Sequence, residues 1–243
     1  MEIVVHRGAN DVAPENTMAS AQACIDLGAD YVEIDVWRSL DGVHYVMHDP
    51  KLDRTTNGSG LIALRTSRYI DRLDAGSWFS PRFANTPVPR LSDFLDWARD
   101  RVKVYLDVKT GSLRRIVSMV RERGMEDRVF FWFWSDRRAR KFRRIAPELP
   151  LKMNSRNADD VHRHKHEFNH QIVEQGPNEA TPEVMAACRE HGIRMMAHVF
   201  GEKGKPETEL HALYRRVVEL GYDMVNLDRP GPFVDFLRKE GLR

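Results

Sequence analysis

The sequence predicts an α/β fold, a closed (β/α)8 barrel of the TIM type, with one long insertion. Short apolar runs alternate with helical segments along the whole chain, and this order indicates a parallel sheet. If the extended runs at 30–37 and 43–48 count as one unit, the chain holds eight strand–helix units. Eight units in 243 residues favour a closed barrel over an open sheet, so we expect one domain over residues 1–243.

The first of the eight units begins with a short strand at Ile3–Val5. Asn16 or Thr17 is expected to cap the first helix, and Gly28 to end it, because Asn and Thr side chains accept N–H groups at helix starts. The remaining elements predicted here are strands at 30–37, 43–48, 103–109 and 128–134, and helices at 92–99, 112–124 and about 135–145.

The last four units follow at regular spacing. Thr181 caps one of their helices and Pro182 opens it, since proline fits the first turn of a helix. The predicted strands lie at 149–153, 170–175, 193–200 and 223–228, and the predicted helices at 159–168, 181–192, 207–220 and 233–240.

Residues 49–90 form the one long irregular connection, rich in Gly, Pro, Asn and Ser. Long connections in compact domains usually have a function. Trp78, Phe79 and Phe83 offer an apolar surface within it, which would suit a lipid substrate. No GxGxxG or GxxxxGK[ST] motif follows a strand, so a nucleotide-binding protein of the usual kind is excluded.

Composition excludes several other classes. The 38 basic and 36 acidic residues give a net charge of +2, without the concentrated basic excess that nucleic-acid binding requires. Cys24 and Cys188 belong to no disulfide framework or metal motif, which fits a reducing compartment. No apolar run approaches the roughly 18 residues of a membrane span, and a strand beginning at residue 2 leaves no room for a signal peptide. We therefore expect a soluble, cytoplasmic protein without stable membrane insertion.

Polar side chains gather where the predicted strands end. In a barrel, chemistry takes place at the carboxyl ends of the strands. Residues at i and i+2 of a strand point to the same face, so such pairs converge. The strand ends carry His6 with Arg7, Glu33 with Asp35, His48 with Asp49, Asp107 with Lys109, and Asn226 with Asp228.

Three acids among them predict a metal site. Glu33, Asp35 and Asp107 would repel one another at close range unless a cation lay between them. Carboxylate oxygens without cysteine ligands suit one hard divalent cation, Mg²⁺ or Ca²⁺.

The basic residues and histidines extend this to a reaction. Arg7 and Lys109 would hold an anion bridged to the metal. His6 and His48 would supply a general acid and a general base near neutral pH. The combination predicts metal-assisted cleavage of a small phosphodiester, in which one histidine activates the nucleophile and the other protonates the leaving oxygen.

Five segments give a more specific interpretation. Taken together and in order, they resemble the glycerophosphodiester phosphodiesterase family over essentially the whole chain. The resemblance implies a TIM barrel with a small inserted subdomain after the second strand, in agreement with residues 49–90. It also implies hydrolysis of a glycerophosphodiester to sn-glycerol 3-phosphate and an alcohol. The segments are "HRGANDVAPENT", "GADYVEIDVWRSLDGVHYVMHD", "LDRTTNGSG", "YLDVK" and "NLDRPG".

The resemblance assigns roles to individual residues. It implies that His6 and His48 are the acid–base pair and that Glu33 and Asp35 are metal ligands. It implies the same phosphate-binding role for Arg7 and Lys109. Pro14 and Asn16 are expected only to shape the turn and cap the first helix.

Asp107 departs from the family pattern, which usually has Glu at this position. The Asp carboxylate sits roughly 1.3–1.5 Å further back, as single-bond lengths indicate. Metal–oxygen distances of about 2.0–2.6 Å do not tolerate that gap without adjustment. We therefore expect Asp107 to bind the metal either directly, from a strand that lies closer, or through a water molecule.

The pocket walls also depart from the family. The segment Ala197-His198-Val199-Phe200 stands where Trp-Thr-Val-Asn is frequent, and Trp132 and Trp134 replace small polar residues. These aromatic residues either pack against the barrel or alter the site for the alcohol. We do not expect His198 to be a third catalytic histidine.

Three alternatives stay open at this point. The same chemistry would serve a lysophospholipase D-type enzyme or a sugar-phosphodiester phosphodiesterase. A non-catalytic phosphodiester-binding protein would result if Asp107 had removed the metal. Neither the head group of the substrate nor the oligomeric state follows from the sequence.

A second histidine pattern lies in "VHRHKHEFNH". His162, His166 and His170 stand at i, i+4 and i+8, the spacing of transition-metal ligands on one helical face. Because Lys, Arg and Glu residues are interleaved, we expect a solvated helix face here.

Overall fold

The computed structural model describes residues 1–202 and 204–243. Helices and strands alternate through both ranges, with short 3-10 helices at Ile62–Leu64, Pro81–Phe83 and Glu126–Arg128. The strands are β1 (Glu2–Val5), β2 (Tyr31–Arg38), β3 (His44–Val46), β4 (Lys103–Val108), β5 (Val129–Trp132), β6 (Lys152–Met153), β7 (Ile172–Gln175), β8 (Arg194–Val199) and β9 (Met224–Leu227). The helices are α1 (Met18–Asp26), α2 (Ser67–Ile70), α3 (Leu91–Ala98), α4 (Leu113–Arg121), α5 (Asp136–Ile145), α6 (Ala158–Phe168), α7 (Pro182–Glu190), α8 (Glu207–Glu219) and α9 (Pro230–Lys239).

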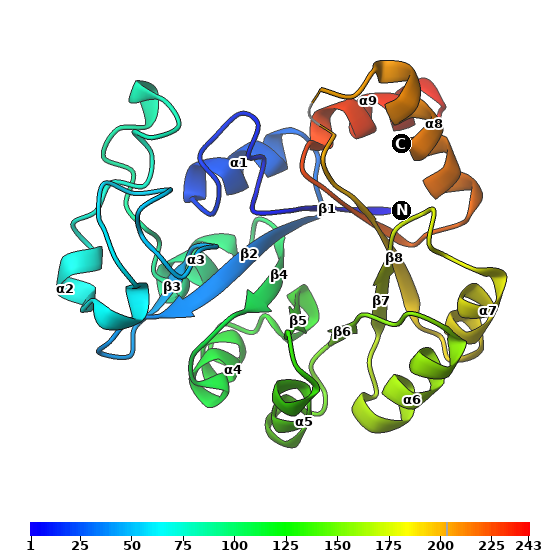
Figure 1. Cartoon of the computed structure of the whole chain (residues 1–243), viewed down its shortest axis with the longest axis horizontal. Coiled ribbons are helices and arrows are strands. Elements are labelled where there is room, and N and C mark those ends of the chain that lie inside the picture. The colour runs from blue at the N-terminus through cyan, green and yellow to red at the C-terminus, as the bar shows by residue number, and fades with distance from the viewer. Residues whose placement is uncertain (203) are drawn as a thin grey trace.

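Eight of these strands form a parallel barrel with helices around it (Figure 1). Their order in the sheet is β5-β4-β2-β1-β9-β8-β7-β6. A parallel bridge between Phe131 and Leu151 joins β5 to the segment that leads into β6, and so brings the two ends of this order together. The predicted (β/α)8 barrel of the TIM type is confirmed.

Alternation along the strands separates two cores. Val4 of β1 packs in a cluster with residues from six other strands, and only the barrel interior brings so many strands together. Its neighbours Ile3 and Val5 belong to the larger cluster between the barrel and its helices. The interior cluster consists of Val4, Tyr31, Tyr105, Phe130, Ile172, Met196 and Met224.

The insertion begins beyond β3, which runs antiparallel to β2 outside the barrel. It forms the small unit around α2 at one side of the molecule (Figure 1). The segment has an apolar cluster that includes Leu52, Ile62 and Leu73 and packs against Tyr45 of β3. The inserted subdomain after the second strand is therefore present, while the boundaries 49–90 and the single domain over 1–243 remain predictions.

The first helix is capped by Thr17, whose side chain accepts the Ser20 N–H in a capping box. Asn16 lies one residue earlier with a positive φ of 56° and is not the cap. The last helix starts at Pro230, three residues before the predicted position, because proline is well suited to the first helical turn.

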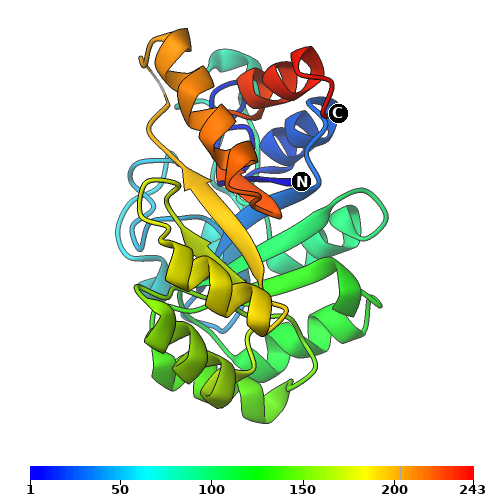
Figure 2. The ribbon, with the colours of Figure 1, turned by 90° about the vertical axis from the view of Figure 1, so that its right-hand side faces the viewer.

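Both chain ends lie on the same side of the barrel (Figure 2). None of the helices described here has both the length and the apolar character that crossing a bilayer requires.

Candidate active site

His6 lies just after β1 and is oriented by a carboxylate. Its Nδ1 is 2.9 Å from Oδ1 of Asp228, which follows β9. Oδ2 of Asp228 accepts the Gly201 N–H at 3.1 Å. Burial alone would raise the pKa of Asp228, but the hydrogen bonds from His6 and Gly201 lower it below its ordinary value. An ionised Asp228 therefore favours the proton on Nδ1 of His6 and leaves Nε2 for exchange with a substrate.

His48, which follows β3, is paired with a carboxylate in the same way. Its Nδ1 is 2.7 Å from Oδ1 of Asp49. The Arg54 guanidinium donates to Asp49 at 2.6 Å and, with the bond from His48, lowers the pKa of Asp49 to about 2. The Trp37 indole donates to the His48 carbonyl at 2.8 Å and fixes the backbone. Both predicted histidines thus pair with an ionised aspartate.

The three predicted metal ligands converge. Glu33 and Asp35 stand on one face of β2, and Asp107 of β4 is the direct register partner of Asp35. One ligand oxygen of each residue lies within 4.8 Å of the others, and all three residues are buried. Burial and the neighbouring carboxylates raise the pKa of Glu33 well above its ordinary value and that of Asp107 to about 6.

This cluster fits a hard divalent cation. Oδ1 of Asp107 is buried without a hydrogen-bond partner, so one carboxylate oxygen of the cluster has no donor. An all-oxygen donor set suits Mg²⁺ or Ca²⁺. The shorter Asp107 side chain still reaches the other two carboxylates because β4 pairs directly with β2.

Lys109 and Arg7 border the cluster. The Lys109 ammonium hydrogen-bonds to Asp107 and lies 3.0 Å from Oδ1 of Asp35. Arg7 has a positive φ of 58°, and its N–H donates to Glu33 at 2.7 Å. Its guanidinium lies 3.8 Å from Asp35, and its Nε is buried without an acceptor. These two cations can take an anion beside the metal cluster.

Asn16 has a larger role than sequence analysis gave it. Its Nδ2 donates to Oδ2 of Asp35 at 2.9 Å, and its Oδ1 accepts the Asp35 N–H at 3.1 Å. The residue is buried, and its own N–H donates to the Arg7 carbonyl. Asn16 therefore fixes Asp35, and the signal for this was its place in the Pro-Glu-Asn-Thr segment.

Lys152, Glu174 and Asn226 occupy the opposite half of the barrel mouth and hold one another. Lys152 is buried and hydrogen-bonds to Glu174, which also accepts from Nδ2 of Asn226 at 3.0 Å. The Lys152 ammonium lies 4.6 Å from the centre of the Trp132 ring, and Lys109 lies 5.7 Å from the same ring. Lys152 and Glu174 are not among the predicted site residues, although Glu174 stands at i+2 from the inward-facing Ile172.

The aromatic residues singled out in the sequence line the rim. Trp132 is half-buried, whereas Trp134 is 74% exposed. Phe200 packs against His6 with ring centres 4.7 Å apart and stacks on His198 with ring centres 5.5 Å apart. Phe200 therefore contacts both His198 and the predicted catalytic residue His6.

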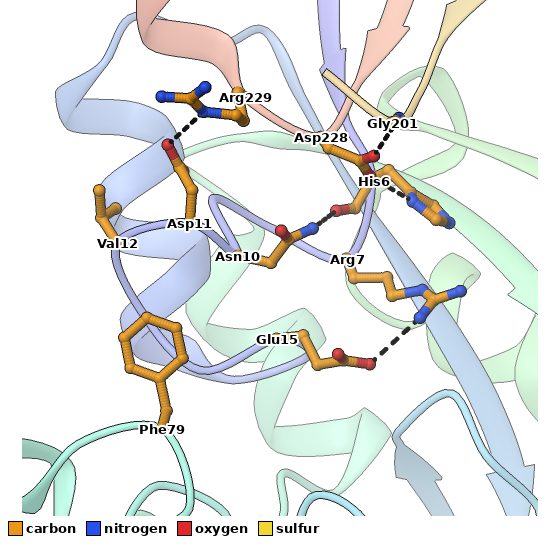
Figure 3. A pocket seen from close by; sticks show the side chains of 10 residues that line it. All are labelled: His6, Arg7, Asn10, Asp11, Val12, Glu15, Phe79, Gly201, Asp228 and Arg229. Atoms are coloured by element: carbon orange, nitrogen blue, oxygen red, sulfur yellow. Dashed lines mark hydrogen bonds and ion pairs between the residues drawn. The ribbon is translucent and has the colours of Figure 1, made fainter. Parts of the chain in front are cut away.

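A cavity of about 880 Å³ adjoins His6 and Arg7 (Figure 3). Phe79 reaches it from the insertion and faces Val12, and Arg229 pairs with Asp11 on its wall at 3.3 Å (Figure 3). Trp78 beside Phe79 is 42% exposed. The full lining consists of His6, Arg7, Asn10, Asp11, Val12, Glu15, Phe79, Gly201, Asp228 and Arg229.

The predicted row of three histidines on one helical face is wrong. Helix α6 ends at Phe168 because Asn169 adopts a left-handed φ of 43°. His170 lies beyond this end and is fully buried. His162 and His166 remain on the helix and are exposed, as a solvated face requires.

Comparison with known proteins gives a consistent result. A model of the glycerophosphoryl diester phosphodiesterase family matches residues 6–231. The glycerophosphodiester phosphodiesterase of Caldanaerobacter subterraneus subsp. tengcongensis is 27% identical over 255 aligned positions, which cover 98% of each chain.

Solved structures agree with this match. The crystal structure of a glycerophosphodiester phosphodiesterase from Agrobacterium tumefaciens superposes with a TM-score of 0.89 at 37% identity, covering 97% of this chain and 99% of that one. A phosphodiesterase from Oleispira antarctica, solved in complex with the product sn-glycerol-3-phosphate, gives a TM-score of 0.85 at 22% identity, covering 98% and 97% of the two chains. At 22% identity the second likeness concerns the fold.

Proposed function

The chain belongs to the glycerophosphoryl diester phosphodiesterase family, whose members are phosphoric diester hydrolases, and on this premise we propose that it hydrolyses a glycerophosphodiester to sn-glycerol 3-phosphate and an alcohol. One observation carries the proposal. Three buried carboxylates, two cations and two aspartate-paired histidines meet at one barrel mouth. The relative from Oleispira antarctica, solved with sn-glycerol-3-phosphate, supports the choice of product.

Glu33, Asp35 and Asp107 would hold one divalent cation, Mg²⁺ or Ca²⁺. When bound, such an ion supplies Lewis-acid polarisation of a phosphoryl oxygen. Asn16 keeps Asp35 in place through two hydrogen bonds, so that the carboxylate does not turn away from the site.

Arg7 and Lys109 bind the non-bridging phosphate oxygens. The Arg7 Nε has no acceptor of its own and is buried, which favours an anion at that position. Lys109 remains close to Asp35 and Asp107, so its charge balances the acids as well as the phosphate. Both cations hold the phosphorus between the two histidines.

His6 and His48 exchange the protons. One Nε2 removes a proton from the attacking water molecule as the water oxygen bonds to phosphorus, and the other Nε2 gives a proton to the alcohol oxygen as the bond from that oxygen to phosphorus breaks. Asp228 and Asp49 keep each ring in the required tautomer and stabilise the imidazolium form. No proton is lost overall, because the base gains one as the acid releases one.

The protein surfaces on the two sides of the phosphate site differ in size and polarity. Lys152, Glu174 and Asn226 form a small buried polar surface, on which the Oδ1 of Asn226 is unpaired. We assign this surface to the glycerol hydroxyl groups, since Glu174 accepts and Lys152 donates hydrogen bonds. The larger cavity beyond His6 is left for the alcohol.

A second substrate class has specific support. Val12 and Phe79 place apolar side chains on the cavity wall, which suits the acyl chain of a lysophospholipid and hence a lysophospholipase D-type reaction. Asn10 and Asp11 on the same wall suit a sugar alcohol instead. The convergence of Asp107 with the other two acids argues against a non-catalytic binding protein.

A head-group panel tests the proposal. Glycerophosphocholine, glycerophosphoinositol and lysophosphatidylcholine are assayed with a chelator and then with added Mg²⁺ or Ca²⁺. We expect metal-dependent release of sn-glycerol 3-phosphate from the first two. Turnover of the lysophospholipid alone would establish the lysophospholipase D-type alternative, and binding without turnover of any substrate would establish a binding protein.

A further inference from the structure

Helices α6 and α7 lie side by side outside the barrel, on elements that supply none of the three acids at the mouth (Figures 1 and 2). Two histidines meet between them. Nδ1 of His162 on α6 lies 2.8 Å from Nε2 of His191, which caps α7. The carboxylate of Glu190 joins them, and one ligand atom of each residue lies within 4.8 Å of the other two.

We propose that His162, Glu190 and His191 form a second metal site, which takes a borderline transition-metal ion, with Zn²⁺ as the representative. This site is separate from the phosphodiesterase chemistry. Two imidazoles and one carboxylate are the donor set of three-ligand zinc sites, which leave the fourth position to water.

Donor chemistry separates this site from the acidic cluster. Imidazole nitrogen suits Zn²⁺, Ni²⁺ and Cu²⁺, whereas carboxylate oxygens alone suit Mg²⁺ and Ca²⁺. The mouth of the barrel offers three carboxylates and no imidazole within its cluster, and the helix pair offers two imidazoles and one carboxylate. Each site therefore prefers a different class of ion.

The distances require only a small adjustment. Nδ1 of His162 and Nε2 of His191 are hydrogen-bonded at 2.8 Å, with the ring planes at 79°. Tetrahedral zinc with Zn–N bonds of about 2.0–2.1 Å separates its two nitrogens by about 3.3 Å. An opening of about 0.5 Å is within reach of the exposed His162 side chain. Each ligating nitrogen must be unprotonated, so on metal binding the proton of this hydrogen bond moves to the other nitrogen of its ring.

The backbone holds the ligands in place. The His191 N–H donates to the Ala187 carbonyl at 3.2 Å, and Gly192, with φ of 59°, donates to Arg189 at 3.1 Å. This turn keeps His191 at the end of α7, where the free carbonyl groups of the helix favour a cation. Arg163, next to His162, is paired with Asp160 at 2.7 Å, which offsets its charge. A bound ion would join α6 to α7 and stabilise the folded chain.

The test is a Zn²⁺ titration by calorimetry with the acidic cluster saturated by excess Mg²⁺. We expect one Zn²⁺ per chain with micromolar affinity, and a loss of at least tenfold in the double variant His162→Ala/His191→Ala. Glu190→Gln should weaken binding by a smaller factor. His166→Ala is the matched control, because it removes an exposed histidine from the same helix and should change nothing.

Co²⁺ gives an independent readout, because a Co²⁺ ion with tetrahedral ligands absorbs visible light. The absorption should appear in the wild type and in His166→Ala and vanish in the double variant. Equal Zn²⁺ affinity in wild type and double variant would overturn the proposal, as would a Zn²⁺ site that disappears only in Asp35→Ala. Turnover of glycerophosphodiesters should be the same in all helix variants, so either result leaves the phosphodiesterase proposal untouched.

Discussion

The two halves of the barrel mouth both enclose charged side chains, but the charges are balanced in only one of them. Glu33 is buried, and only 10% of the Glu174 side chain is exposed. Burial and the acids at Asp35 and Asp107 raise the pKa of Glu33 well above its ordinary value. Burial also acts on Glu174, but the Lys152 ammonium outweighs it and lowers the pKa.

The difference distinguishes a site that needs a ligand from one that is already balanced. In the acidic half, three carboxylates share one lysine and one arginine, and an oxygen of Asp107 has no hydrogen-bond partner. In the opposite half, Lys152 and Glu174 neutralise each other. We infer that the acidic half carries the chemistry and that the balanced half positions the substrate.

The largest effects should come from the histidines of the acidic half. Replacing His6 or His48 by Ala should lower kcat by about 10²–10⁴ and leave KM nearly unchanged, since general acid–base catalysis acts in the transition state. Steady-state kinetics on glycerophosphocholine measures this. A variant with more than a third of wild-type kcat would remove that residue from the mechanism.

The aspartates behind the histidines should have the next largest effect. Asp228→Asn and Asp49→Asn keep the shape of each pair but no longer favour the reactive tautomer. We expect kcat to fall about 10–100-fold, as for other groups that orient a catalytic ligand, together with a shift in the pH–rate profile. A fall in activity without any shift in the profile would point to a structural role only.

The balanced half should affect binding instead. The paired change Lys152→Met/Glu174→Gln removes both charges together, because removal of one alone leaves the other buried and unpaired. We expect KM for glycerophosphocholine to rise about tenfold, from the loss of hydrogen bonds to the glycerol. Bis(p-nitrophenyl) phosphate, which has no glycerol, is the control and should keep its KM. Equal losses on both substrates would break the division between the halves.

The smallest effect concerns stability and pH. Without metal, the folded state holds a proton on Asp107 up to a pKa of about 6, whereas the unfolded chain releases it near 3.8. Stability contributed by this group is therefore present below pH 4 and lost as pH rises through about 6, by at most about 3 kcal/mol.

Urea unfolding of wild type and Asp107→Asn in chelator measures this difference. The wild type should lose stability relative to the variant between pH 4 and pH 7, and saturating Mg²⁺ should reverse the order at pH 7. An equal pH dependence of the two proteins would mean that Asp107 has no shifted pKa.

The acidic half was predictable from sequence because its signal is local. Glu33 with Asp35, and Asp107 with Lys109, stand at i and i+2 on long strands, so periodicity alone places each pair on one face. The predicted barrel then brings the strand ends together. The resemblance to a family suggested which of these residues bind metal and which bind phosphate. Distances and burial do not test these roles.

The balanced half was not predictable because its contacts are between strands. Lys152 lies on a strand of two residues, and its partner Glu174 is 22 residues away. Asn16 contacts Asp35 across 19 residues through a left-handed backbone, which looks like an ordinary turn in sequence. His170 left the predicted helix face because of one left-handed residue, Asn169.

The most direct test of the proposed metal-dependent hydrolysis is turnover as a function of metal concentration. The protein is stripped exhaustively with chelator and then titrated with Mg²⁺ or Ca²⁺, in wild type and in Asp107→Ala, with glycerophosphocholine as substrate. We predict no turnover in the stripped wild type, recovery that saturates at one ion per chain, and an affinity at least tenfold weaker in Asp107→Ala. Full turnover of the stripped wild type would contradict the assignment of chemistry to the acidic half.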